Sequence, residues 1–173
     1  MSIRSDLGSI THVNTTRAIS GTNAQTIYSF FPGVDTVTAT VSWDDTALLA
    51  SQGKQLMTAT ITPAATTNLL IVHANMVWAD SAATTEAMFF LTAGPTGGAS
   101  GAALMTVMGE AQTNEPNTTH LMWAGFPTAA TQHIYAIRCI RGFAGTLTFN
   151  GASGLRKLGG ISGSGMIITE VVQ

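Results

Sequence analysis

Short runs of alternating apolar and polar residues, separated by clusters of Gly, Pro, Asn and Ser, dominate this chain. In residues 54–62, Met57, Ala59 and Ile61 alternate with three threonines, which is typical of a β-strand with one buried side. Only residues 46–55 show a pattern that could form a turn or two of helix. We predict about ten strands, at residues 25–31, 36–43, 54–62, 68–78, 86–92, 103–110, 118–126, 133–141, 146–150 and 166–172. The predicted fold class is all-β, an antiparallel two-sheet sandwich.

The last predicted strand is apolar on both faces. Met166 and Ile168 alternate with Ile167 and Val171, and residues 69–72 have the same character. One face of each sheet in an antiparallel sandwich normally meets water. We therefore expect a second subunit to cover the outer face of one sheet.

The composition supports assembly. The chain has 173 residues, of which 45% are hydrophobic and only 9% are charged, whereas a soluble domain usually carries about 25% charged residues. A surface this poor in charge exposes broad apolar patches, which usually mark contact with another chain. We expect an obligate oligomer.

Charge and hydropathy also argue against other partners. The net charge is −2, and no Lys or Arg lies between Lys54 and Arg138, so we expect no nucleic-acid partner. No run approaches the roughly 20 apolar residues of a spanning helix, so we expect no membrane insertion. The first 14 residues lack the apolar core of a signal peptide, and export through the standard route is not expected.

Cys139 is the one residue that suggests nucleophilic catalysis, with His133 or His120 as a base. Cys139 is the only cysteine, so it cannot form a disulfide within the chain. His133 lies six residues away in the same predicted strand, about 20 Å at the rise of a strand. We therefore expect a buried thiol, no catalytic residue and no enzyme activity.

The candidate metal ligands are few. Asp44 and Asp45 offer two carboxylates, whereas Ca²⁺ takes six to eight oxygens. The four histidines lack the close spacing of a zinc site; they are His12, His73, His120 and His133. We expect no cofactor and no metal site in one chain, although a three-fold axis could gather one histidine from each subunit.

The remaining large polar and aromatic residues have structural interpretations. We expect Arg156 to pair with a carboxylate such as Glu170, and Arg138 and Arg141 to serve similarly. The three tryptophans are expected to be core or oligomer anchors rather than a sugar platform; they are Trp43, Trp78 and Trp123.

Two blocks of sequence carry a family resemblance. VSWDDTALLASQGKQLMTATITPAATTNLLIVHANM, at residues 41–76, resembles a pattern in small β-proteins of tailed bacteriophages: an acidic pair with Thr, a short connection, a Gly-Lys-Gln strand, ITP and an apolar strand. The C-terminal block, with LTFNG, Arg156, GG, SGS and MIITEV, resembles the end of the same proteins. Residues 79–130 and the first 40 residues lie outside the resemblance.

The resembling domains are similar to TNF-like jelly rolls, which assemble as homotrimers. The resemblance implies residues 41–173 as a jelly-roll domain after an N-terminal extension or attachment segment, residues 1–40. It also implies a place on the virion, on the capsid or tail surface, after assembly in the host cytoplasm. Such domains occur on tail fibres, head fibres and capsid decoration proteins alike, so the fold does not select among these roles.

Two functions follow. The first is a structural virion protein, a capsid decoration (cement) or head-fibre subunit, whose N-terminal segment binds the major capsid protein or another virion protein. The second is a tail-fibre or tail-tip module that contacts a host surface receptor, glycan or protein, through the loops at residues 94–101 and 114–117.

Overall fold

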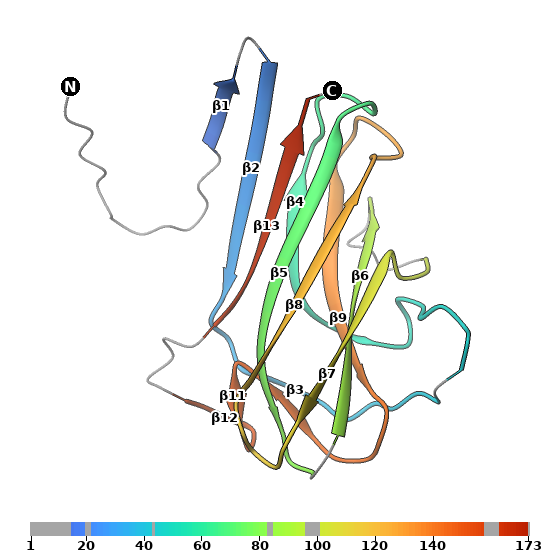
Figure 1. The fold of residues 1–173 in the computed structure, drawn as a ribbon, viewed down its shortest axis with the longest axis vertical. Helices are drawn as coiled ribbons and strands as arrows, with labels where there is room; N and C mark the ends of the chain where they lie inside the picture. The colour runs from blue at the N-terminus through green and yellow to red at the C-terminus, as the bar shows by residue number, and fades with distance from the viewer. Residues whose placement is uncertain are drawn as a thin grey trace, which may run out of the picture.

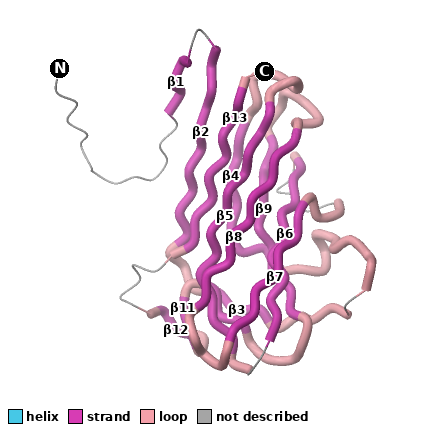
Figure 2. The backbone as a smooth tube through the Cα atoms, viewed as in Figure 1, coloured by secondary structure: helices cyan, strands magenta, loops and turns pink. Residues whose placement is uncertain are grey.

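The computed structural model describes residues 15–19, 22–42, 44–82, 85–95, 101–157 and 163–172. All regular structure in these residues is β-strand (Figures 1 and 2). The strands are β1 (Thr15–Ile19), β2 (Thr22–Phe31), β3 (Asp35–Val37), β4 (Lys54–Ile61), β5 (Leu69–Asp80), β6 (Thr85–Gly94), β7 (Met105–Ala111), β8 (Asn117–Gly125), β9 (His133–Arg141), β10 (Leu147–Phe149), β11 (Gly151–Ala152), β12 (Leu155–Arg156) and β13 (Ser164–Val171).

Eight of these strands form two packed antiparallel sheets. The larger sheet contains the run β2-β13-β5-β8, and the smaller sheet has the order β4-β9-β6-β7. If only these eight strands are numbered in chain order, the larger sheet has the order 1-8-3-6 and the smaller sheet has the order 2-7-4-5. That interleaving of two Greek keys is the jelly roll, so the predicted fold class is confirmed. In Figure 1 the larger sheet lies in front of the smaller one.

The sandwich begins earlier than residue 41. β2 pairs with β13 from Thr26 to Phe31, and β3 pairs with β10. Residues 22–37 are therefore part of the jelly roll, although we assigned them above to the N-terminal extension. β1 pairs with β2 and adds an edge strand to the larger sheet, while residues 1–14 lie outside the described residues.

The core lies between the sheets and follows the two-residue period of the strands. β5 contributes Leu70, Val72, Ala74, Met76 and Trp78, each of them buried. The indole of Trp78 tilts against the ring of Phe89, with 5.6 Å between ring centroids, and its Nε1–H donates to Thr119 Oγ1 at 2.9 Å. Burial of such rings at about 25 cal/mol per Å² makes them a main source of stability.

Each of the ten predicted strands has an observed counterpart, one of which is shorter than expected, whereas β1, β11 and β12 were not predicted. Residues 36–42 form only part of β3 and a bridge at Thr40, because the chain crosses here from one sheet to the other. Val37 pairs with Leu147 in the larger sheet, and Thr40 bridges Arg141 in the smaller one. A strand cannot pair continuously across that step.

The helical expectation for residues 46–55 is wrong. Asp44 Oδ1 accepts a hydrogen bond from Thr46 N–H at 2.9 Å and forms a tight turn. Beyond it the backbone pairs with residues 101–103, since Ala50 N–H donates to Gly101 O and Ala103 N–H donates to Leu48 O. These extended pairings occupy backbone groups that a helix would need.

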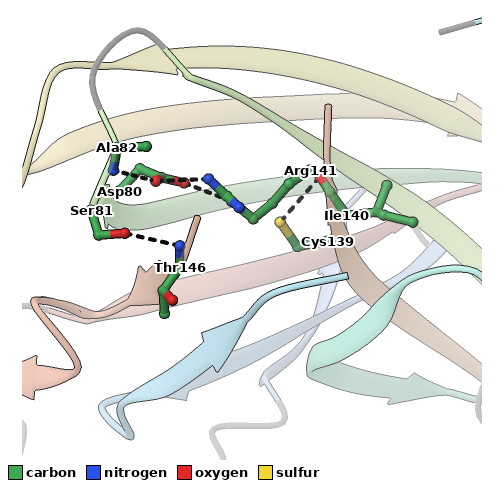
Figure 3. Close-up of polar contacts among 7 residues, drawn as sticks. All are labelled: Asp80, Ser81, Ala82, Cys139, Ile140, Arg141 and Thr146. Carbon is green, nitrogen blue, oxygen red and sulfur yellow. Dashed lines mark hydrogen bonds and ion pairs between the residues drawn. The ribbon is translucent and has the colours of Figure 1, made fainter. Parts of the chain in front are cut away.

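A buried ion pair fastens one end of the sandwich (Figure 3). Arg141, at the end of β9, donates from Nε and Nη2 to the two carboxylate oxygens of Asp80, at the end of β5, each at 2.8 Å. Both side chains are fully buried. Next to the pair, Ser81 N–H donates to Thr146 O, and Thr146 N–H donates to Ser81 Oγ. The pair therefore joins the two sheets where their chains turn.

Candidate interaction face on the larger sheet

The side of the larger sheet that points away from the core carries apolar side chains. Along β13, Met166 and Ile168 are buried while Ile167, between them, is 39% exposed. The same alternation on β2, β5 and β8 defines the outer face, made by Thr26, Tyr28, Phe30, Leu69, Ile71, His73, Asn75, Val77, Thr118, His120, Met122, Ala124, Gly165, Ile167, Thr169 and Val171. The prediction that β13 is apolar on both sides is confirmed.

Strand register brings distant residues into rows across this face. Ile167 stands opposite Tyr28 on one side and opposite His73 on the other, and His73 stands opposite Met122. This row, Tyr28–Ile167–His73–Met122, gathers residues from four segments of the chain. Residues that face each other directly on one side of a sheet have Cβ atoms about 4.5–5.5 Å apart, so the row forms one continuous surface.

The centre of the outer face is hollowed. An open concavity of about 340 Å³ is lined by the four residues of the row and also by Phe30, Asn75 and His120. Two glycines make room for it: a Cβ on Gly163 would lie 2.5 Å from Phe30 Cζ, and one on Gly165 would lie 3.3 Å from Tyr28 Cε2. The aromatic rings therefore lie across backbone that carries no side chain, which exposes their faces to a partner.

The smaller sheet treats its outer side differently. Met88, Phe90 and Ile140 are buried there beneath Val41, Leu48 and Ala103, which lie in the connection between β3 and β4 and in the connection between β6 and β7. Nothing in the described part of the chain covers the outer face of the larger sheet in the same way. Tyr28, Phe30, Met122 and Ile167 therefore form an exposed apolar cluster on this face, while other exposed apolar side chains, such as Met105 and Met108 on β7, lie elsewhere.

The outer face carries no Asp, Glu, Lys or Arg among its described residues. Its ionisable side chains are Tyr28, His73 and His120. It also holds an unmet hydrogen-bond acceptor, because Asn75 Oδ1 is buried and has no partner in the described structure. A buried acceptor without a donor costs about 1–3 kcal/mol, and a donor from a partner molecule would remove that cost.

The carboxylate of β13 lies on the opposite side of the sheet. Glu170 is buried beside the core, where it accepts hydrogen bonds from Asn68 Nδ2 at 2.6 Å, Ala64 N–H at 2.8 Å and Gln25 Nε2 at 2.5 Å. Burial alone would raise the pKa of Glu170, but these donors favour the charged form and lower its pKa below the usual value. The expected pairing of Arg156 with Glu170 is wrong, since Arg156 is exposed and its Nη2 is 3.5 Å from Pro32 O.

The other two arginines, Arg138 and Arg141, have different kinds of partner. Arg141 pairs with a carboxylate, Asp80, as expected. Arg138 instead donates to Gly53 O at 3.1 Å and to Gln55 Oε1 at 3.0 Å. Both contacts lie on the smaller sheet, away from the outer face.

Of the residues considered for catalysis, Cys139 and His133 are buried, whereas His120 lies on the outer face. Cys139 is fully buried, and burial raises the pKa of its thiol far above the usual value. His133 is also buried, with Nε2 2.9 Å from Ala129 O. The prediction of a buried thiol is confirmed, and a protonated thiol in the core is not a nucleophile.

The tryptophans follow the expected roles where the structure describes them. Trp78 is in the core, and Trp123 packs against it with its ring 5.8 Å from that of Tyr135. Trp43 lies outside the described residues. Asp44 and Asp45 are exposed in the turn before β4, and the described residues contain no cluster of three His, Cys, Asp or Glu side chains that could hold a metal ion.

The two predicted contact loops do not come together. Residues 94–101 connect β6 to β7, and residues 114–117 lead from β7 into β8. They therefore lie at opposite ends of β7, and residues 96–100 are outside the described residues. Asn114 is held internally, since its N–H donates to Asp80 O and its Oδ1 accepts from Ser153 Oγ.

The positions of His73 and His120 in their strands indicate which side of the sheet each occupies. His73 and His120 looked scattered, but each occupies an outward position in an alternating strand, as do their apolar neighbours Ile71 and Met122. The alternation of inward and outward positions along each strand therefore places both histidines on the outer face. Their proximity depends on the pairing of β5 with β8, which alternation cannot supply.

No known protein family matches the sequence, and no curated protein sequence matches it. Solved structures with a similar fold include Eiger TNF from S. frugiperda, with 12% identity over 86% of this chain and 92% of that chain, at a TM-score of 0.42. The infectious bursal disease virus VP2 subviral particle matches with 16% identity over 82% of this chain but only 37% of its own, at a TM-score of 0.29. These likenesses concern the fold alone. No helix in the described residues is long and apolar enough to cross a membrane.

Proposed function

We propose that this protein is a structural, non-enzymatic surface protein of a tailed-phage virion, a capsid decoration (cement) or head-fibre subunit that works as a homotrimer. The observation that carries the assembly is the uncharged, apolar outer face of the larger sheet. The phage assignment rests on the resemblance of residues 41–76 and of the C-terminal block to small phage β-proteins.

The occupant of the outer face is a second copy of this chain. An uncharged face can pack against another uncharged face without leaving a charge unpaired. Every copy of the chain carries this same face. In a closed trimer the apolar row is buried on each subunit, which limits uncontrolled association. The N-terminal segment binds the major capsid protein or another virion protein.

The host-receptor alternative has less support. It relies on the loops at residues 94–101 and 114–117, which lie at opposite ends of β7 and so do not make one site in a subunit. A tail-fibre role would require host contacts elsewhere on the surface.

Sedimentation of the full chain tests the assembly. We expect about three times the chain mass of 17.9 kDa. Met122→Lys, at a side chain 63% exposed on the outer face, should give a folded monomer, because burying an unpaired ammonium is costly. Met108→Lys, at a side chain 55% exposed on the smaller sheet, is the matched control and should stay trimeric. A wild-type monomer, or equal behaviour of the two variants, would contradict the proposal.

Removal of residues 1–14 tests the location on the virion. These residues precede β1, so the pairing of β2 with β13 is retained. We expect the shortened protein to trimerise but to be missing from purified phage particles. If the particles keep the protein and only adsorption to the host suffers, the receptor-binding alternative is correct.

A further inference from the structure

Two histidines share the concavity on the outer face. His73 in β5 stands opposite Met122, and His120 in β8 stands opposite Asn75, so the two imidazoles are diagonal neighbours on adjacent strands. Diagonal neighbours on one face lie about 7–8 Å apart between Cα atoms and less between side chains. Both rings therefore sit near the centre of the proposed subunit contact.

The groups that face these imidazoles offer no counter-charge. Each strand around the concavity contributes neutral side chains: Tyr28 and Phe30 from β2, Ile167 from β13, Asn75 from β5 and Met122 from β8. The only carboxylate on β13 is Glu170, which points to the other side of the sheet and is satisfied by Gln25, Asn68 and Ala64. A positive charge on His73 or His120 would thus have no described acidic partner.

The geometry points to a pH-sensitive release device: neutral His73 and His120 permit the outer faces to pack, and their protonation drives the subunits apart. This inference rests on the proposed homotrimer and adds its regulation. Histidine side chains change charge between about pH 5 and 8. A three-fold assembly would bring together two imidazoles from each subunit, and protonation would place like charges in an apolar contact, where they lose their solvation and repel one another.

The sign of the effect follows from proton linkage. The assembled form disfavours the protonated rings, whereas a separated subunit keeps them in water, so separation takes up protons. Assembly therefore weakens as the pH falls through the range in which histidine side chains change charge, between about pH 8 and 5. Each imidazole that must stay neutral in the assembly weakens association by up to about tenfold per pH unit once the separated subunit is protonated.

The test compares the full-length protein at about pH 8 and about pH 5, at equal ionic strength, by sedimentation velocity, with far-UV circular dichroism to follow the strands. We expect the wild type to be trimeric at the higher pH, and to form folded monomers at the lower pH. The variant His73→Gln/His120→Gln should remain trimeric at both. His133→Gln is the control, because His133 is buried beside Ala129 O away from the outer face, and it should dissociate like the wild type.

Each result has a distinct meaning. A monomer at the higher pH overturns the proposed assembly itself. A trimer at both pH values overturns the switch and leaves the assembly standing, as does equal dissociation of the wild type and the double variant. If the double substitution prevents folding, the single variants replace it: each should keep about half of the logarithmic loss of affinity, and a full loss in both would refute the role of these histidines.

Discussion

Removal of Arg141 from its buried pair with Asp80 should destabilise the fold more than any change of a surface charge. Arg141→Met leaves the Asp80 carboxylate fully buried, and its one remaining donor among the described residues is the backbone N–H of Ala82, at 3.0 Å. Breaking a buried pair by deleting one partner costs about 3–5 kcal/mol. For a chain of this size that corresponds to a fall in Tm of roughly 6–20 °C.

The structure supplies a matched control for this prediction. Lys54 pairs with Asp35 on the surface, with side chains 43% and 42% exposed. Lys54→Met removes one positive charge from an ion pair, as Arg141→Met does, but solvent screens the remaining carboxylate. The expected cost is at most about 1 kcal/mol.

A double-mutant cycle isolates the pairwise energy. Asp80→Asn alone leaves the guanidinium buried without its counter-charge, and Arg141→Met alone leaves the carboxylate. The double variant removes both charges and also the Arg141 Nη1 group, which has no partner among the described residues. We therefore expect it to be more stable than the sum of the single costs predicts, by about 2 kcal/mol or more.

Urea denaturation at one fixed protein concentration is the assay, because association contributes to the stability of an oligomer. Coupling below about 0.5 kcal/mol in the cycle would show that the two side chains act independently. Such a result, or an equal loss in Lys54→Met and Arg141→Met, would refute the inference that this pair fastens the sandwich.

Two further predictions concern the core. Because the folded-state pKa of Glu170 is lowered, its contribution to stability is present above the unfolded value of about 4.5 and is lost as the pH falls below it; Glu170→Gln should cost about 1–3 kcal/mol at neutral pH and flatten the acid limb of a pH–stability curve. In Gly109→Ala the new Cβ would lie 2.4 Å from Thr119 Oγ1 and 2.8 Å from Trp78 Cζ2, so thermal unfolding should show a loss of about 1–3 kcal/mol, whereas Gly33→Ala, with no atom within 4 Å, should not be destabilised.

The strands were predictable because each follows a local rule. Alternation in β4 gives both its position and its buried side, and β9, a run rich in apolar residues, begins and ends at the predicted residues. The misses fall where local pattern is weak. β11 and β12 have two residues each, and residues 48–50, in the segment expected to be helical, pair with the distant residues 101–103.

The candidate site was predictable only in part. The apolar outer side of β13 follows from parity at Ile167, and parity also puts Glu170 on the inner side with Met166 and Ile168. We nevertheless expected Glu170 to meet Arg156, because opposite charges in one segment suggested a pair. The row Tyr28–Ile167–His73–Met122 depends on pairings between residues far apart in the chain, which no local pattern encodes.

The buried charges strengthen the case for assembly beyond what composition implied. The chain has seven Lys and Arg and nine Asp and Glu, sixteen charged residues in all. Four of them are buried: Asp80, Arg138, Arg141 and Glu170. At most twelve charges therefore remain to solvate the surface of a 173-residue chain, and none of the described ones lies on the outer face of the larger sheet. The outer face thus carries no charge, although four charged side chains are buried inside the fold. This distribution supports the proposal that another copy of the chain packs on this face.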